Sequence, residues 1–201
     1  MLIKKMIKFF LISTLLLSPI VITNAHAAEI PLEDLTKPEY KEWAPTKPEF
    51  QLVTRLFADL EGTRLNLGKI SDAGVRRIVP ITGGHFDGPM LKGEILNLGA
   101  DWQIANADGT LVLIEARYVL KTEDGALINV TTKGVKATST EVLEESKKGP
   151  VHPSKYFFKQ YLTLETSHPK YTWVNNALFI GSIMSSGVYK KGIVQDIYLV
   201  K

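Results

Sequence analysis

The feature that most constrains this chain is a series of short alternating segments, separated by turns, that runs from residue 50 to the C-terminus. Its clearest member, Leu111–Lys121, carries apolar side chains at alternate positions, which is the period of a half-buried strand. The turns Asn106–Gly109 and Glu123–Ala126 flank it and are typical of hairpins. The other predicted strands are Phe50–Leu60, Arg76–Ile81, Asp101–Ile104, Leu127–Thr132, Phe157–Thr166, Tyr171–Ile180 and Ile193–Val200. Turns about every 10 to 15 residues predict an antiparallel sandwich or closed barrel.

One segment has helical signals instead. Thr138 and Glu141 form a capping-box pattern, and the stop signals of Lys147–Pro150 follow. The predicted fold is therefore all-β, an antiparallel β-barrel with one short connecting helix.

The N-terminus has the pattern of a secretory signal peptide. Three lysines within the first eight residues precede an apolar stretch, Phe9–Ile22, and Ala25–Ala27 supplies a small-x-small cleavage site. The apolar stretch contains serine, threonine and proline and is too interrupted for a spanning helix, which needs about 18 apolar residues. We therefore expect residues 1–27 to be cleaved after Ala27, the protein to be periplasmic or secreted, and no stable membrane insertion to remain.

The charge and cysteine content exclude several classes of protein. Removal of 27 of the 201 residues leaves 174, in which 21 basic residues balance 21 acidic ones, because the three charges lost are all lysines. A neutral chain gives no support for a nucleic-acid partner. The absence of cysteine excludes a disulfide framework, a cysteine nucleophile and thiolate metal sites.

A proline-rich arm is expected between the leader and the barrel. Residues 28–49 contain four prolines, which forbid a long helix and disfavour a central strand. Either Tyr40 and Trp43 anchor this arm to the domain surface, or the arm is a disordered terminus.

Three segments of the chain have a distinctive sequence, namely GGHFDGPMLKGEILNLGADWQIANADGTLVLIEARYVLKTEDGALINVTTKG (Gly83–Gly134), KYFFKQYLTLETSHPKYTWVNNALFIGS (Lys155–Ser182) and the terminal IVQDIYLV. Together they resemble a known family, called domain of unknown function 3237 (DUF3237) or uncharacterised protein family 0311. The resemblance covers about Phe50–Lys201 and implies a single domain, residues 50–201, that is an antiparallel β-barrel of lipocalin-like shape, with homo-oligomers among its members. It implies little about chemistry.

Known catalytic and cofactor motifs do not fit. Gly83–Gly88 lacks the lysine and hydroxyl residue of a P-loop, and neither a G-x-S-x-G elbow nor an H-E-x-x-H pair occurs. His85 and Asp87 stand two apart, as the start of a metal site would, but no third ligand is evident. We expect a tight glycine bend that carries His85, with no metal and no cofactor.

Polar residues within the strongest strand are the first candidate ligand contacts. Glu115 and Arg117 share the face opposite the apolar one of Leu111–Lys121. If this face lines the barrel interior, the two residues form a buried pair that orients a polar ligand. If it faces water, they are a solvated pair contributing about 0 to 1 kcal/mol.

Two tryptophans beside polar residues are the second group of candidates. Trp102 follows Asp101, and Trp173 shares a strand parity with Asn175. Such groups either form a pocket that stacks a flat ligand and binds its polar edge, or they pack in the core.

These residues leave three classes of function open. The first is a barrel that binds a small, partly apolar molecule, with Trp102 and Trp173 as walls and Glu115, Arg117 and Asn175 as polar contacts. The second is a cofactor-independent isomerase, cyclase or lyase. In it His85 or Asp101 moves a proton, and Tyr118 or Arg117 stabilises an oxyanion. The third is a structural subunit whose interior is filled by side chains.

Overall fold

The structure is a computed structural model that describes residues 46–185, 187 and 189–201. The expected signal peptide and most of the expected arm, including Tyr40 and Trp43, lie outside these residues. Within the described part, no helix is long and apolar enough to cross a membrane.

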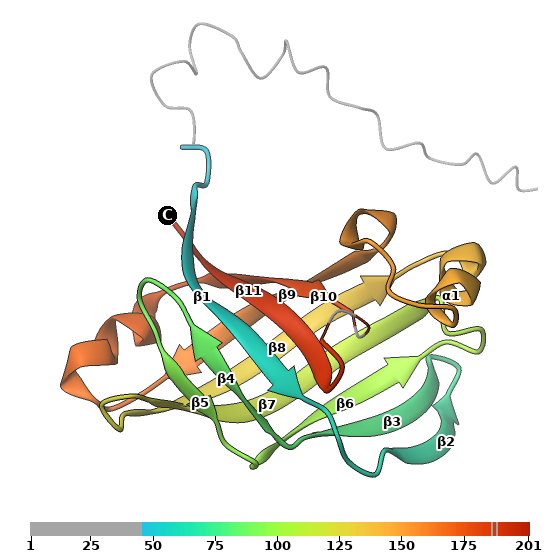
Figure 1. Cartoon of the computed structure of the whole chain (residues 1–201), viewed down its shortest axis with the longest axis horizontal. Helices are drawn as coiled ribbons and strands as arrows, with labels where there is room; N and C mark the ends of the chain where they lie inside the picture. The colour runs from blue at the N-terminus through green and yellow to red at the C-terminus, as the bar shows by residue number, and fades with distance from the viewer. Residues whose placement is uncertain (1–45, 186, 188) are drawn as a thin grey trace, which may run out of the picture. The chain divides into compact units, whose positions relative to one another are not determined.

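The described residues form an antiparallel sheet that closes into a barrel (Figure 1). Its strands are β1 (Phe50–Asp59), β2 (Leu65–Ser71), β3 (Gly74–Ile81), β4 (Gly83–Asp87), β5 (Gly93–Ile95), β6 (Gly99–Ala105), β7 (Leu111–Thr122), β8 (Leu127–Ala137), β9 (Phe157–Glu165), β10 (Phe179–Met184) and β11 (Gly192–Val200). The barrel runs in the order β7, β5, β4, β1, β11, β10, β9, β8 and returns to β7. The predicted antiparallel barrel is confirmed.

The helical segments are short. They are α1 (Thr140–Ser146) and the 3-10 helices η3 (Pro153–Lys155) and η4 (Pro169–Asn176). The expected helix is present, but its N-cap is Ser139 and not Thr138: the Ser139 side chain accepts a hydrogen bond from the backbone N–H of Val142.

The expected strand Tyr171–Ile180 is wrong over its first half, where η4 lies instead. The Asn175 side chain explains this, because it accepts from the Thr166 backbone N–H at 2.8 Å and donates to the Thr166 carbonyl at 2.9 Å. These bonds fold the segment back on the end of β9 and take the place of a sheet ladder.

The two ends of the barrel differ. β3 and β4 are separated only by Thr82, but β4 pairs with β1, whereas β3 pairs with β2 and β6. β7 likewise pairs with β5 along its C-terminal part and with β6 along its N-terminal part. The sheet therefore splits beyond Asp59, and the end of the barrel nearest β2, β3 and α1 is its open end (Figure 1).

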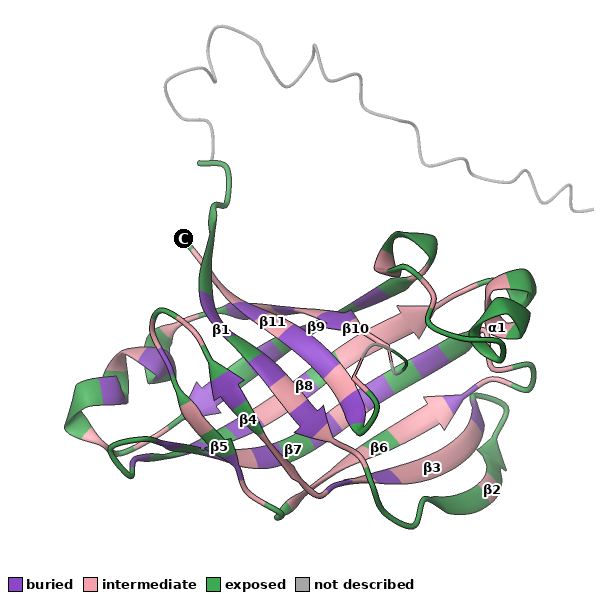
Figure 2. Ribbon diagram, viewed as in Figure 1, coloured by how far each residue is buried: buried purple, intermediate pink, exposed green. Residues whose placement is uncertain are grey.

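Apolar side chains fill the closed end. On β7 the apolar parity predicted from the sequence is the inward one, and buried residues alternate along the strands (Figure 2). The largest fully buried apolar side chains are Leu56, Phe86, Leu91, Leu120, Ile128, Leu162, Leu164, Phe179 and Ile197. η4 adds Tyr171 and Val174 to the same core.

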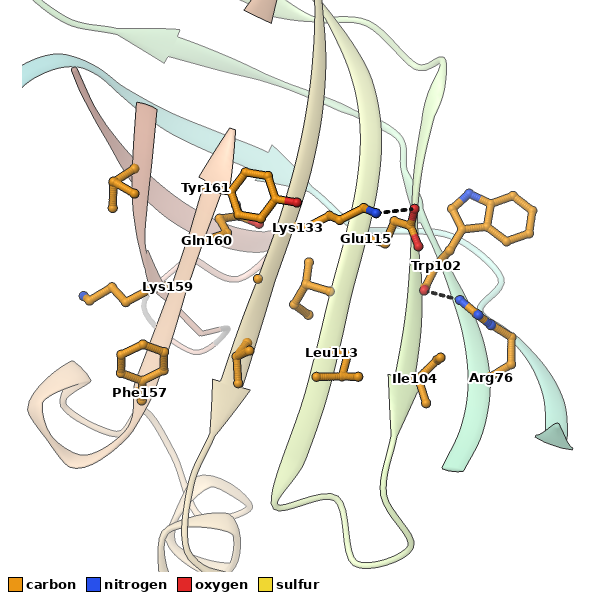
Figure 3. A pocket seen from close by; sticks show the side chains of 14 residues that line it. Arg76, Trp102, Ile104, Leu113, Glu115, Lys133, Phe157, Lys159, Gln160 and Tyr161 are labelled. Carbon is orange, nitrogen blue, oxygen red and sulfur yellow. Dashed lines mark hydrogen bonds and ion pairs between the residues drawn. The ribbon is translucent and has the colours of Figure 1, made fainter. Parts of the chain in front are cut away.

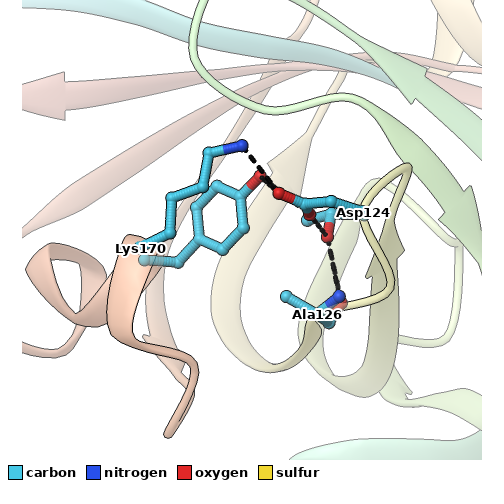
Figure 4. Close-up of polar contacts among 5 residues, drawn as sticks. Asp124, Ala126 and Lys170 are labelled. Atoms are coloured by element: carbon cyan, nitrogen blue, oxygen red, sulfur yellow. Dashed lines mark hydrogen bonds and ion pairs between the residues drawn. The ribbon is translucent and has the colours of Figure 1, made fainter.

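A polar cluster ties η4 to the β7–β8 turn (Figure 4). The Lys170 ammonium lies 2.6 Å from an Asp124 carboxylate oxygen, and the Tyr171 hydroxyl donates to that carboxylate at 2.9 Å. Thr122 donates to the other oxygen and also accepts from the Ala126 backbone N–H. The hydrogen bond from Lys170 holds the pKa of Asp124 well below its usual range.

We expect Asp124→Ala to lower the melting temperature, because η4 loses its charged contact with the turn. Since the pKa of Asp124 is lowered by folding, its contribution is present above about pH 4 and is lost as the pH falls further. The deficit, measured by circular dichroism melts, should therefore shrink in acid. Glu123→Ala in the same turn is the control, and an equal loss in that variant would contradict a specific role for Asp124.

Candidate binding and acid–base site

The open end of the barrel contains a cavity of about 410 Å³ lined by residues of β3, β6, β7, β8, β9, β11 and α1. A smaller space of about 40 Å³ lies deeper in the barrel. Both are lined by Asp101, Ile114 and Phe158. The barrel is therefore filled at its closed end and hollow at its open end.

Asp101 lies where the two spaces meet, on the inward face of β6 opposite Ala116 of β7. The β6–β7 register pairs Asp101 with Ala116 and resumes at Ile104 with Leu113. In the gap, the Glu115 backbone N–H donates to one carboxylate oxygen at 3.1 Å, and the Gln103 amide donates to the other at 2.6 Å. The Asp101 side chain thus takes the place of the backbone carbonyl that would otherwise accept from the Glu115 N–H in the ladder.

Burial sets the protonation of Asp101. Removal of the carboxylate from water raises its pKa from 3.8 to about 6, although the bonds from Gln103 and Glu115 act in the opposite direction. A carboxyl group with such a pKa exchanges protons near neutral pH, which is what a general acid or base requires.

Further polar atoms line the deep space. The Tyr118 hydroxyl and the Gln195 amide nitrogen are buried and have no hydrogen-bond partner among the described residues. Thr132 donates to the Gln160 amide oxygen at 2.6 Å. Burial raises the pKa of Tyr118, so its hydroxyl is a donor at neutral pH.

Two glycines make room for the buried glutamines. A Cβ atom at Gly181 would lie 2.2 Å from the Gln195 amide nitrogen, and one at Gly134 would lie 2.4 Å from the Gln160 Cβ. Only glycine at these inward positions allows both glutamine side chains to lie inside the barrel.

Of the four residues proposed for proton transfer or oxyanion stabilisation, the structure brings two together. Asp101 and Tyr118 both line the deep space. His85 does not join them, because it lies exposed on β4, where its ring stacks on Phe57 at 4.6 Å. Its neighbour Asp87 pairs with Lys92 at 2.8 Å. In the part of the chain that the structure describes, no group of three or more His, Asp or Glu residues is placed to hold a metal ion.

Three of the proposed ligand contacts lie outside the barrel, on or beside an outer groove of about 570 Å³ (Figure 3). Trp102 is 48% exposed, and Glu115 lies 3.8 Å from Lys133. Arg117 is exposed on the same face of β7. Of the two alternatives for the face that carries Glu115 and Arg117, the structure has the solvent-facing one, because the inward positions of β7 belong to its apolar parity.

The remaining two ligand candidates lie at the closed end, in η4. Trp173 packs against Phe179 with ring centroids 6.0 Å apart. The exposed Asn175 holds the backbone of Thr166. Trp173 therefore packs against the core, which is one of the two alternatives expected from the sequence. Asn175 does not reach the cavity.

Sequence reasoning missed the inward polar residues of the cavity, which are Arg77, Gln103, Lys136, Gln160 and Gln195. A signal for one of them was present. Gln160 occupies the same parity as Phe158, Leu162 and Leu164, and a lone polar residue in an apolar row marks a break in the core.

Comparison with known proteins agrees with this architecture. A family model described as a protein of unknown function (DUF3237) matches residues 48–200. A UPF0311 protein from Rhodopseudomonas palustris is 38% identical over 138 residues, which are 68% of this chain and 86% of that protein. A crystal structure of a conserved protein of unknown function from the same species covers 78% of this chain and all of its own, with 34% identity and a TM-score of 0.70.

Two further proteins are similar. The crystal structure of a β-barrel-like protein from Acinetobacter baumannii has 44% identity and a TM-score of 0.68, and covers 79% of this chain and 99% of its own. A hydroalkoxylation enzyme from Penicillium herquei is 30% identical over 112 residues, which are 56% of this chain and 60% of that enzyme.

Proposed function

This chain belongs to the DUF3237 family, and from that premise we propose that it binds a small, partly apolar organic molecule in the open end of its barrel. The observation that carries the proposal is a cavity of about 410 Å³ that shares Asp101, Ile114 and Phe158 with a deeper space, which is lined by buried polar atoms without hydrogen-bond partners among the described residues. This volume falls in the range of about 300 to 1,000 Å³ that is usual for small-molecule sites. Ile114 and Phe158 supply apolar walls, and Tyr118 and Gln195 supply polar contacts.

A second candidate function is cofactor-independent acid–base chemistry of the isomerase, cyclase or lyase type. Asp101 favours it, because its raised pKa lets it take a proton from a bound molecule and return it. The Tyr118 hydroxyl is available to donate to an oxygen that gains negative charge. The relative from Penicillium herquei is named a hydroalkoxylation enzyme, and this supports a catalytic role for this chain.

We also propose that the protein acts in the periplasm or outside the cell. The leader pattern of residues 1–27 supports this location.

Titration with N-phenylnaphthylamine, an uncharged fluorescent molecule, tests the binding proposal. Ile114 is 6% exposed and lines both spaces inside the barrel, whereas its neighbour Leu113 is 42% exposed and lines the outer groove alone. We expect Ile114→Trp to fill the cavity and weaken binding by about tenfold or more, which corresponds to about 1.4 kcal/mol. The matched variant Leu113→Trp should bind as the wild type does.

Ile114→Phe adds less bulk and replaces Ile114→Trp in the titration if the tryptophan variant does not fold. Overpacking a core typically lowers the free energy of unfolding by about 1 to 3 kcal/mol. Weakened binding in Leu113→Trp alone would place the bound molecule in the outer groove and contradict the proposal. Binding that neither position affects would contradict it as well.

A further inference from the structure

The charges around the mouth of the barrel do not balance. Seven charged residues line the large cavity, namely Arg64, Arg77, Asp101, Asp108, Lys136, Glu144 and Lys147. Glu144 pairs with Lys147 at 2.5 Å, and Asp108 accepts hydrogen bonds from the backbone and side chain of Thr110. Four cations therefore face three carboxyl groups, which leaves a net charge of +1 with Asp101 ionised, and Arg64, Arg77 and Lys136 form no ion pair among the described residues.

Two of those cations face inward. Arg77 lies on β3 opposite Gln103, and Lys136 lies on β8 opposite Val112. No carboxylate of the described residues comes within 4 Å of the side-chain nitrogens of either residue, unlike the lysines paired on the outer surface. Both are free to contact a molecule in the cavity.

Lys136 lies in an apolar setting. Its ammonium nitrogen lies 5.8 Å from the centre of the Phe158 ring, which is buried. Burial lowers the pKa of Lys136, because its charged form loses water without gaining a carboxylate. An unpaired cation in such a place is costly, and an anion entering the cavity would relieve that cost.

The deeper groups favour the same kind of ligand. Both oxygens of Asp101 already accept hydrogen bonds, and the amide oxygen of Gln160 accepts from Thr132. The polar atoms left without partners include the Tyr118 hydroxyl and the Gln195 amide nitrogen, both of which donate. The interior is therefore rich in free donors, whereas several of its acceptors are occupied.

We propose that the molecule bound by this barrel is an organic anion, with an anionic oxygen group held at the mouth by Arg77 and Lys136. Its apolar body lies against Ile114 and Phe158, and a second oxygen accepts from Tyr118 or Gln195 in the deep space. This inference rests on the proposed function, because it names the chemical class of the ligand of the same cavity.

A pair of fluorescent molecules separates the two proposals. Anilinonaphthalene sulfonate has the skeleton of N-phenylnaphthylamine plus one sulfonate, which stands in for the anionic oxygen group. We expect the wild type to bind the sulfonate compound more tightly than the neutral one. Lys136→Met and Arg77→Met should each weaken binding of the sulfonate compound by about tenfold and change binding of the neutral compound by less than about twofold.

Lys133→Met is the matched control, because Lys133 lies on the same strand but on the outer face, beside Glu115. An equal loss of affinity for the sulfonate compound in this variant would mean that the overall charge of the protein causes the effect, and would overturn the inference. Equal affinities of the wild type for both compounds would also overturn it, while cavity binding of the neutral compound would keep the proposed function intact. If Ile114→Trp weakens the binding of neither compound, the proposed function itself fails.

Discussion

Asp101→Asn should make the folded protein more stable at pH 8, by up to about 3 kcal/mol, because a shift of one pKa unit corresponds to about 1.4 kcal/mol. In the wild type, burial raises the pKa of Asp101 from 3.8 to about 6. The folded state therefore holds this proton more tightly than the unfolded state does. The stability that protonation gives is fully present below about pH 4 and is lost as the pH rises through about 6. Asparagine is neutral at every pH and retains an oxygen that accepts from Gln103 or Glu115.

Urea denaturation at several pH values measures this effect. The gain of Asp101→Asn over the wild type should be small at pH 4 and reach its full size above pH 7, since the wild type alone titrates between these values. Asp72→Asn is the control, because Asp72 is exposed and pairs with the exposed Lys69; the stability of this variant should follow that of the wild type. If the free energy of unfolding varied with pH in the same way for the wild type and Asp101→Asn, folding would not raise the pKa of Asp101.

The same variant bears on catalysis. If the barrel performs acid–base chemistry, Asp101→Asn removes the proton carrier and leaves the cavity in place. A variant that is more stable, still binds the fluorescent molecules and turns over no substrate is the result expected of a catalytic carboxyl group. Retained turnover would leave Asp101 with a purely structural role at the gap in the β6–β7 ladder.

Phe179→Ala should destabilise the protein by about 3 to 5 kcal/mol, the usual cost of truncating a buried phenylalanine. The side chain of Phe179 is 0% exposed and packs against Trp173 of η4 at the closed end of the barrel. Its position on β10 places it opposite Leu162 of β9 and Leu199 of β11. Truncation therefore opens a hole where three strands and η4 meet, and little nearby chain is free to fill it.

Phe157→Ala is the matched control, since it removes the same side chain from a position that is 53% exposed on the outer groove. We expect its free energy of unfolding to change by less than about 1 kcal/mol. Chemical denaturation of both variants gives the comparison. Losses of similar size would mean that the outer groove is as tightly packed as the core. A small loss in both would mean that the closed end is not the stabilising core of the barrel.

The strands that could be predicted are those with a strong local pattern. β7 has an apolar residue at every second position from Val112 to Leu120, and the turns around it carry Asp-Gly, so the sequence was sufficient to predict it. Tyr171–Asn176 also has β-forming residues, but the side chain of Asn175 bonds to Thr166 nine positions earlier. No local pattern contains that contact, and the predicted strand was wrong there.

The candidate site could be predicted only in part. Asp101 and Tyr118 were proposed, and they meet because β6 and β7 are neighbours. Glu115 and Trp102 were proposed with them and lie on the outer face, since adjacent residues of a strand point to opposite sides. Lys136 and Gln195 were not proposed, because nothing in their own segments separates an inward polar residue from an outward one.

The sequence by itself determined the class of the fold, the alternation of the strands, the short helix and the family, since these depend on the order of residues within each segment. The tertiary structure decided which end of the barrel is filled and which is hollow. That difference arises because β4 pairs with β1 while β3 does not. It also decided which polar residues meet in the cavity. Asp101, Gln160 and Gln195 come from three strands far apart in the chain, and only closure of the sheet brings them together and shields them from water.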